Sequence, residues 1–265
     1  MDAMKNDEIR QAVRQQYGRV AESNGAGCGC GPSCCDTPAA VSAETMSQGL
    51  GYSAQDVTVV PQGANMGLGC GNPQAIAALQ PGETVLDLGS GGGFDCFLAA
   101  AQVGDSGRVI GVDMTPEMVS KARANAANGG YRNVEFRLGE IEHLPVADGT
   151  VDAIISNCVI NLSPDKAQVF RDVFRVLKRG GRLAISDIVA TAELPPEAKS
   201  DLALYTGCMA GASLVAELES MLHAAGFGQV SITPKDASRE FIRDWAPGSK
   251  IEDFVVSANI EAVKR

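Results

Sequence analysis

A glycine-rich turn directly after a short apolar run is the feature that most constrains the fold of this chain. The run Thr84–Leu88 is typical of a strand, and Gly89, Gly91 and Gly93 follow it, before a helix-like stretch at 94–103. Glycines let a backbone turn tightly and approach a ligand closely, and the following helix offers free N–H groups. This order is typical of an open α/β sheet, which binds its ligands outside the carboxyl ends of the strands.

The same alternation continues along the chain. Further strands are expected at 108–113, 134–138, 151–156 and 182–187, with two late ones near 229–233 and 254–263. Helices are expected at 5–21, 116–127, 166–177 and 213–225, and Gly180 and Gly181 should stop the third of these. Such alternation indicates βαβ units with helices on both faces. We therefore predict an α/β fold, a doubly wound and mostly parallel seven-stranded sheet with an N-terminal helical arm.

Composition excludes several classes of protein. Of the 265 residues 45% are apolar, enough for a sizeable core, and the net charge of −10 disfavours binding to nucleic acid or anionic lipid. The segment Met1–Arg10 lacks the apolar run of a secretory signal, and no stretch approaches about 20 apolar residues. We expect a cytoplasmic protein, with a helix and cysteine-rich loop over 1–60 and one main domain over 61–265.

Eight cysteines and only two histidines point to thiol chemistry. In an intracellular chain, thiols are more often ligands or reactants than disulfide partners, and thiolates select soft ions. A soft metal or metalloid is therefore the expected ligand. One group lies in a glycine-rich stretch that we expect to be a mobile loop, namely Cys28, Cys30, Cys34 and Cys35. The others are scattered at Cys70, Cys96, Cys158 and Cys208.

The scattered cysteines have different local settings. Cys158 follows the fourth expected strand, at the rim where substrates meet a cofactor. Cys70 and Cys208 are flanked by glycines, which favours an exposed, closely approached backbone over a core position. Cys96 lies on the helix after the glycine turn and is expected to be a buried small hydrophobe.

Asp113 ends the second expected strand, 20 residues after Gly93, where a carboxylate can accept hydrogen bonds from both ribose hydroxyls. The run Val85-Leu-Asp-Leu-Gly-Ser-Gly-Gly-Gly93 together with Gly111-Val-Asp113 resembles the first two motifs of class I S-adenosylmethionine-dependent methyltransferases, which are Rossmann-like. The resemblance implies that Asp87 orders the glycine loop, that Asp113 holds the ribose and that Met114 lies along the adenine. It also implies contacts to the methionine part from Gly89, Ser90, Gly91 and Gly93.

A later segment resembles the third motif of the same family. It is Gly139-Glu-Ile-Glu-His-Leu-Pro145, and by that match Glu140 accepts from the adenine amino group while Ile141 offers a backbone N–H. Asn157, just after the fourth expected strand, occupies the place where the family meets the methionine end of the cofactor.

Three cysteine motifs narrow the resemblance to arsenite methyltransferases. They are P-x-G-x-N-x-G-L-G-C-G-N-P from Pro61, S-N-C-V-I-N-L from Ser156 and T-G-C-x-A-G-A from Thr206. The match implies that Cys158 and Cys208 hold As(III) and that Cys70 joins them during turnover. The cluster at 28–35 resembles the cysteine-rich segment of many members. Its thiols, with Cys34 and Cys35 as candidate arsenic ligands, are equally consistent with a metal scavenger or a redox-buffering loop.

The expected function is transfer of methyl groups from S-adenosylmethionine to thiolate-bound trivalent arsenic, giving mono- and dimethylated arsenicals in arsenic detoxification. A thiol reductant such as thioredoxin or glutathione would reopen the disulfide that turnover leaves, and a monomer is expected. Two alternatives stay open. A carbon or oxygen methyltransferase of the quinone-biosynthesis type would need an aromatic or isoprenoid pocket, although aromatic residues are only 5%. A thiol-rich metalloid-binding protein would not need the intact glycine and acidic motifs.

Replacing Cys28, Cys30, Cys34 and Cys35 together with serine should leave the fold intact, because a segment of this composition has little apolar surface to bury. The check is the thermal unfolding midpoint of the variant beside that of the unchanged protein. A large drop in that midpoint would show that the segment is structural.

Overall fold

The computed structural model describes residues 3–23 and 42–265. The expected cysteine-rich loop, with Cys28, Cys30, Cys34 and Cys35, lies outside these ranges.

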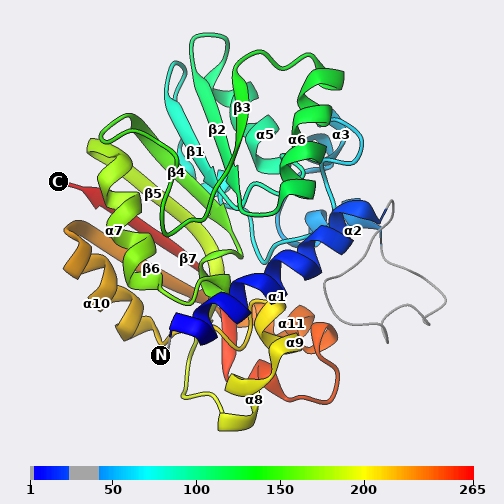
Figure 1. Cartoon of the computed structure of the whole chain (residues 1–265), viewed down its shortest axis with the longest axis vertical. Helices are drawn as coiled ribbons and strands as arrows, with labels where there is room; N and C mark the ends of the chain where they lie inside the picture. The colour runs from blue at the N-terminus through cyan, green and yellow to red at the C-terminus, as the bar shows by residue number, and fades with distance from the viewer. Residues whose placement is uncertain (1–2, 24–41) are drawn as a thin grey trace.

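A single seven-stranded sheet organises the chain, in the order β3-β2-β1-β4-β5-β7-β6 (Figure 1). Every neighbouring pair from β3 to β5 is parallel, whereas β7 runs antiparallel to both β5 and β6. The predicted fold class is therefore confirmed. The strands are β1 (Thr84–Leu88), β2 (Arg108–Asp113), β3 (Val134–Leu138), β4 (Val151–Asn157), β5 (Leu177–Ala190), β6 (Phe227–Lys235) and β7 (Val255–Lys264).

Apolar side chains on both faces of the central strands explain why helices cover the sheet twice. Val85 of β1 packs into one core cluster with Phe97 and Val119, whereas Leu86 packs into the other with Phe170 and Leu222. Parallel strands that are buried on both faces need a helical layer on each. Three of the helices covering the first face are α4 (Gln74–Ala77), α5 (Phe94–Val103) and α6 (Pro116–Gly129), and those covering the second are α7 (Lys166–Val176) and α10 (Val215–Ala225).

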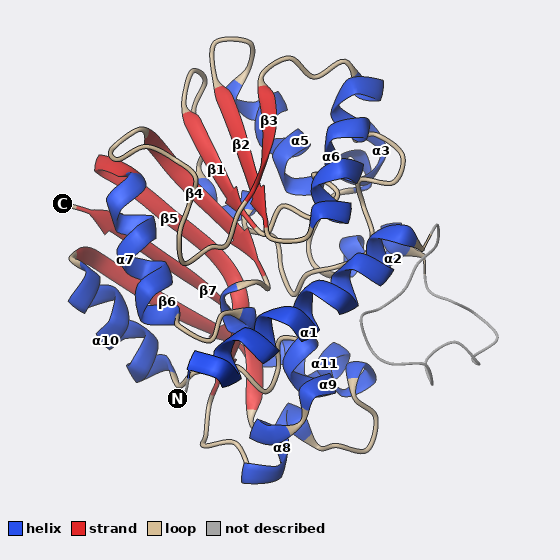
Figure 2. Cartoon of the chain, viewed as in Figure 1, coloured by secondary structure: helices blue, strands red, loops and turns tan. Residues whose placement is uncertain are grey.

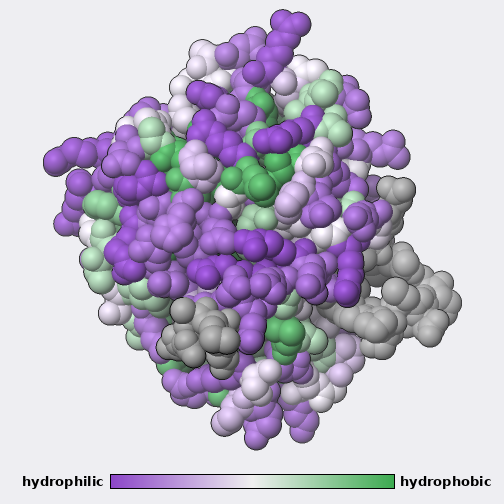
Figure 3. Space-filling model, viewed as in Figure 1, coloured by the Kyte–Doolittle hydropathy of each residue, from purple (hydrophilic) through white to green (hydrophobic). Residues whose placement is uncertain are grey.

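The N-terminal helix α1 (Ala3–Glu22) confirms the predicted helical arm and crosses the molecule below the carboxyl ends of the central strands (Figure 2). Its outward face is mainly hydrophilic (Figure 3), while Val13 on the inward face is 1% exposed. An amphipathic helix in this position closes the end of the sheet where ligands bind.

Several short helices were not predicted from the sequence. In α2 (Ala43–Gly49) and α3 (Ala54–Val59), Ser42 and Ser53 cap the first turns, and Asp56 completes a capping box with Ser53. Such helices depend on caps and tertiary packing, because a single turn has almost no apolar periodicity. The others, all around the site end of the sheet, are α8 (Pro196–Ser200), α9 (Leu202–Thr206), α11 (Arg239–Trp245) and the 3₁₀ turns Ile160–Leu162, Asp236–Ser238 and Ile251–Asp253.

The expectation that Gly180 and Gly181 stop the helix at 166–177 was wrong. Helix α7 ends at Val176, and both glycines lie inside β5. The pairing of β4 with β5 shifts register between Val151 and Ala153, so the two glycines occupy an irregular stretch of strand rather than a helix cap.

Within residues 3–23 and 42–265, no helix has both the length and the apolar character required to cross a membrane.

The Gly211→Ala variant should be destabilised by about 1–3 kcal/mol, since a Cβ at this position would lie 2.1 Å from the backbone oxygen of Asn161. Chemical denaturation measures the loss as a lower free energy of unfolding. Gly49→Ala is the matched control, because its Cβ would have no neighbour within 4 Å. Equal stability of both variants would contradict the close contact that holds the loop after α9.

Candidate active site

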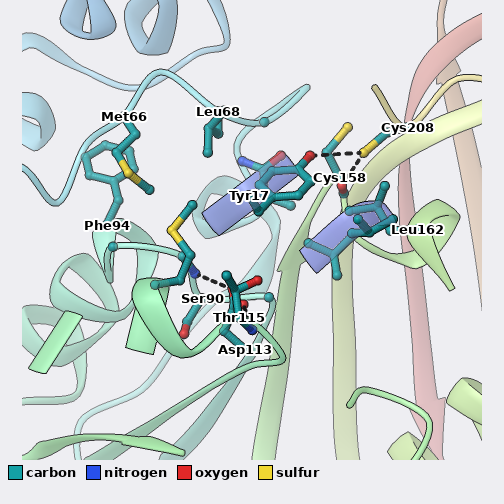
Figure 4. A pocket seen from close by; sticks show the side chains of 18 of the residues that line it. Tyr17, Met66, Leu68, Ser90, Phe94, Asp113, Thr115, Cys158, Leu162 and Cys208 are labelled. Atoms are coloured by element: carbon teal, nitrogen blue, oxygen red, sulfur yellow. Dashed lines mark hydrogen bonds between the residues drawn. The ribbon is translucent and has the colours of Figure 1, made fainter. Parts of the chain in front are cut away.

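A cavity of about 180 Å³ opens at the carboxyl ends of β1, β2 and β4. Helix α1 forms one wall through Arg10, Val13 and Tyr17, and the glycine loop after β1 forms another. The close-up in Figure 4 shows two ends to this space, with Ser90 and Asp113 at one end and Cys158 and Cys208 at the other. The two ends carry different chemistry.

The glycine loop is tightly built. Gly89 and Gly91 have φ angles of +67° and +50°, which residues with a side chain rarely adopt. A Cβ on Gly89 would lie 2.3 Å from Cγ2 of Val159. Both glycines line the cavity with Ser90, whereas Gly93 lies behind them at the start of α5. The Ser90 Oγ is buried without a hydrogen-bond partner among the described residues, so it is available to a ligand.

Asp113 lies beside this loop at the end of β2. Its carboxylate accepts hydrogen bonds from the backbone N–H groups of Gly91, at 3.0 Å, and of Thr115, at 2.8 Å. Burial raises the pKa of Asp113 above its ordinary value, while these N–H groups oppose the rise. Met114 lines the cavity next to it.

The two glutamates of the loop after β3 differ in their position relative to the cavity. The Glu140 carboxylate bonds Arg14 and lies 3.5 Å from Arg10 Nε, and Glu140 is not among the residues that line the cavity. Ile141 and Glu142 do line it, and buried Glu142 accepts from Arg10 at 3.1 Å and from the Ser163 hydroxyl at 2.8 Å. The adenine contact assigned to Glu140 stays a prediction.

Cysteines from three separate segments meet near the other end of the cavity, which Cys158 and Cys208 line and Cys70 does not. The Sγ atoms of Cys70 and Cys158 lie within 4.8 Å of each other and of a carboxylate oxygen of Asp187. The Cys208 thiol donates a hydrogen bond to the Cys158 backbone oxygen at 2.7 Å. Cys70 and Cys208 are 2% and 3% exposed, so the expectation of an exposed backbone was wrong for both, because α1 and the loop after α9 cover this end.

The backbone around these thiols is unusual. Cys158 and Cys208 have φ angles of +60° and +64°, a left-handed conformation that costs a residue with a Cβ of order 1 kcal/mol or more. Glycines bring the Cys70 loop close, because a Cβ on Gly69 would lie 2.6 Å from the Asn157 side chain and one on Gly71 would lie 2.9 Å from Ser186. The close approach expected from the flanking glycines is therefore present.

The thiols are held in the protonated form. Burial raises the pKa values of Cys70 and Cys158, and contact with the Cys158 thiol together with burial raises that of Cys208. Burial also raises the pKa of Asp187 to about 6, against the stabilising N–H groups of Ile188 and Ile160. Because the thiols at this end of the cavity are protonated, a neutral substrate could exchange its ligands for them without a charge being buried.

Tyr17 of α1 lies between the two ends of the cavity (Figure 4). Its hydroxyl is 4.0 Å from the Cys208 Sγ and donates to the Thr206 carbonyl at 3.3 Å. Burial raises the pKa of Tyr17 well above its ordinary value, so the ring remains neutral. The helical arm thus contributes directly to the thiol end.

A chain of hydrogen bonds joins the glycine loop to the Cys70 loop. The Tyr52 hydroxyl donates to Asp95 on α5 at 2.9 Å, and the Asn157 side-chain amide donates to Tyr52 at 3.1 Å. The Asn157 side-chain oxygen accepts from the Cys70 N–H at 2.9 Å. Separately, the Cys96 thiol donates to buried Asp87 at 3.2 Å, so Cys96 packs behind the loop as expected.

Sequence reasoning missed several residues of the site. Tyr17 lies on the same helical stripe as Ile9 and Val13, and was counted only as an apolar position. Asp187 is the last residue of the fifth expected strand, 182–187, and lies within β5 in the structure; its place at the end of the expected strand was a usable signal. Trp245 of α11 also lines the cavity, but nothing in the sequence places a residue so distant along the chain beside it.

Comparison with known proteins agrees with this geometry. Residues 79–226 match the family described as a methyltransferase domain, so the chain is a methyltransferase of this class. An arsenite methyltransferase of Halobacterium salinarum is 56% identical over 97% of this chain and 67% of its own length. One of Aquipseudomonas alcaligenes is 40% identical over 83% of this chain and 62% of its own length.

The solved structures give the same result. An arsenic(III) S-adenosylmethionine methyltransferase from Chlamydomonas reinhardtii, CrArsM, superposes with a TM-score of 0.62 at 32% identity, over 83% of this chain and 73% of that one. The chain belongs to the arsenite methyltransferase family. It spans about two thirds of the length of the curated relatives that it matches.

The Asp95→Asn variant should become more stable relative to the unchanged protein as the pH rises. Burial raises the pKa of Asp95 to about 6. Between about pH 4 and about pH 6 the folded state therefore holds a proton that the unfolded state has lost, so raising the pH through this range lowers the stability of the unchanged protein by about 2 kcal/mol. Chemical denaturation at both pH values measures the difference, and a constant difference would contradict the burial of this carboxyl.

Proposed function

We propose that this protein transfers the methyl group of S-adenosylmethionine to trivalent arsenic held by Cys70, Cys158 and Cys208. The observation that carries the proposal is a cavity with the Cys158 and Cys208 thiols at one end and a glycine loop with Asp113 at the other, with the buried Cys70 thiol within 4.8 Å of that of Cys158. The named arsenite methyltransferases at 56% and 40% identity support the same assignment.

The residues at the loop end fit the proposed methyl donor. Ser90 offers a buried hydroxyl with no partner in the described chain, and the missing side chains at Gly89 and Gly91 leave the backbone open to the methionine part. Asp113 would hold the ribose hydroxyls, Met114 would lie against the adenine, and Asn157 would lie toward the methionine end. When bound, S-adenosylmethionine supplies a sulfonium methyl group that is already activated for transfer.

The thiol end would hold the acceptor in place. As(III) is a soft, three-coordinate ion, and two or three thiolates bind it strongly while its lone pair stays free. Each thiol gives its proton to a hydroxide leaving from arsenic, so the exchange produces water and buries no net charge. The neutral Tyr17 ring and the Cys208 loop would orient the lone pair toward the loop end, and orientation supplies most of the catalysis because the attack needs no general base.

Turnover also needs reducing equivalents. Methyl transfer raises arsenic formally to the +5 state, and two neighbouring thiolates can return it to +3 by giving up two electrons and forming a disulfide. Cys70 and Cys158 are neighbours of this kind. We propose that an external thiol reductant, of the thioredoxin or glutathione type, then reopens the disulfide, and that the products are mono- and dimethylated arsenicals.

Single substitutions of the three cysteines should fail in different ways. Mutating a residue that only orients a ligand of a bound ion typically lowers affinity or activity about 10- to 100-fold. Loss of a ligand itself, in Cys158→Ser or Cys208→Ser, should therefore reduce the methylation rate of every trivalent arsenical more than about 100-fold. Cys70→Ser should spare a monomethylated substrate, which has only two exchangeable positions. The measurement is the methylation rate of arsenite and of methylarsenite, with excess dithiol present.

Asp113→Ala provides the complementary control. It should weaken binding of the methyl donor by about 10- to 100-fold through lost ribose hydrogen bonds, yet leave arsenite binding intact. Cys158→Ser should show the reverse, with donor binding preserved. If Cys158→Ser keeps the rates of the unchanged protein on both arsenicals, the thiol site is misplaced and the arsenic assignment fails.

A further inference from the structure

A buried carboxylate stands beside the thiols and has no part in the proposed methyl transfer. Asp187 of β5 is 1% exposed, and one of its oxygens lies within 4.8 Å of the Sγ atoms of both Cys70 and Cys158. As(III) with three thiolates and its lone pair has no need of an oxygen ligand. A soft divalent cation, in contrast, takes four ligands and combines thiolate with carboxylate.

We propose that Cys70, Cys158 and Asp187 form a binding site for a soft divalent cation, Zn²⁺ or Cd²⁺, and that this cation excludes As(III) from the thiols. Only the exclusion of arsenic rests on the proposed function. The cation site rests on the geometry of the three side chains.

The spacing of the ligand atoms suits such an ion. Two sulfurs bonded at about 2.3 Å to a tetrahedral zinc lie about 3.8 Å apart, so the observed group has to contract by no more than about 1 Å. Side-chain rotation supplies that movement. The Cys208 thiol donates to the Cys158 backbone oxygen at 2.7 Å and lies outside this group of three ligand atoms, so a water molecule would supply the fourth ligand.

The Asp187 carboxylate is fixed in place and still has acceptor capacity. Its Oδ1 accepts from the Asn161 side chain at 2.9 Å and from the Ile188 N–H at 2.7 Å, and its Oδ2 accepts from the Ile160 N–H at 2.8 Å. Two carboxylate oxygens offer about four acceptor positions, so one remains for a cation. Hydrogen bonds of this kind orient a ligand and stabilise its charged form.

The net charge of the occupied site differs between As(III) and a divalent cation. As(III) with three thiolates is neutral, so a fourth anionic ligand adds only unfavourable charge to a buried site. A divalent cation is already neutral with two thiolates, and the charge of Asp187 is offset by Lys166, whose ammonium interacts favourably with it. Binding of the cation releases two thiol protons to solvent. Asp187 therefore stabilises the divalent cation and not the arsenic.

The test uses full-length protein in which Cys28, Cys30, Cys34 and Cys35 are serine, so that only the thiols of the described chain can respond. Cd²⁺ is titrated and followed by thiolate-to-cadmium charge-transfer absorption and by proton release. As(III) binding is followed by the fluorescence of Trp245, the single tryptophan, which lines the cavity. These titrations contain no methyl donor, so their outcome does not depend on methyl transfer. A protein that binds Cd²⁺ as expected but does not methylate arsenic would contradict the proposed function and not the cation site.

We expect one Cd²⁺ per chain with release of two protons. Asp187→Asn should weaken Cd²⁺ binding at least about tenfold and change As(III) binding by less than about twofold. Asp172→Asn is the matched control, because Asp172 is a buried carboxylate of α7 outside the cavity, and it should change neither affinity. Equal Cd²⁺ affinity in the Asp187→Asn variant would overturn the proposal.

Two measurements keep the proposal testable if Asp187→Asn does not fold. In the parent protein saturating Cd²⁺ should abolish the fluorescence change that As(III) causes, and a complex that holds both ions would overturn the exclusion. X-ray absorption of the zinc-loaded parent should show two sulfurs with a carboxylate oxygen. Four sulfur ligands and no oxygen ligand around the zinc would show that Asp187 is not a ligand and would overturn the proposed site.

Discussion

The rest of the site depends on the hydrogen bonds of the Asn157 side chain. At the end of β4 its oxygen accepts from the Cys70 N–H, and its amide donates to the Gly71 carbonyl at 2.8 Å and to Tyr52. Tyr52 in turn bonds Asp95, in the first turn of the helix that follows the glycine loop. One amide thus ties a loop that precedes the sheet to both ends of the cavity. A chain lacking it would keep the strands but lose the placement of Cys70.

Packing at the same point explains the left-handed cysteines. The Cys158 N–H donates to the Ser186 carbonyl at 2.8 Å, so β4 is still paired with β5 when the chain turns sharply at Cys158. The turn directs the Cys158 carbonyl toward the Cys208 thiol, while the 3₁₀ turn that follows supplies the Ile160 N–H and the Asn161 side-chain amide to Asp187. Strain of this kind persists only where surrounding contacts determine it, and here those contacts assemble the thiols.

The sheet could be predicted from the sequence because buried parallel strands and glycine turns leave a strong local signal, as Val85–Gly93 does. The positions of Asp113 and Cys158 beside the cavity could be predicted because they lie at the carboxyl ends of strands, where such sheets bind ligands. Tyr17, Glu142 and Asp187 join the site through side-chain contacts with residues distant along the chain, and such contacts leave no periodicity in the sequence. Arg10 and Arg14 of helix α1 pair with Glu140, a contact between distant parts of the chain that no local sequence pattern indicates.

The charges around the cavity indicate which partners it can take. Four acidic residues line it, Asp87, Asp95, Asp113 and Glu142, against one basic residue, Arg10. Burial raises the pKa values of the three aspartates, so the free site carries carboxyls that lack nearby cations. In the proposed function, a sulfonium donor with an ammonium group would bring the missing positive charge to the loop end, whereas arsenic would reach the thiol end as a neutral hydroxide and remain neutral as a trithiolate. The two ends of one cavity can therefore differ in charge without either burying an unpaired ion.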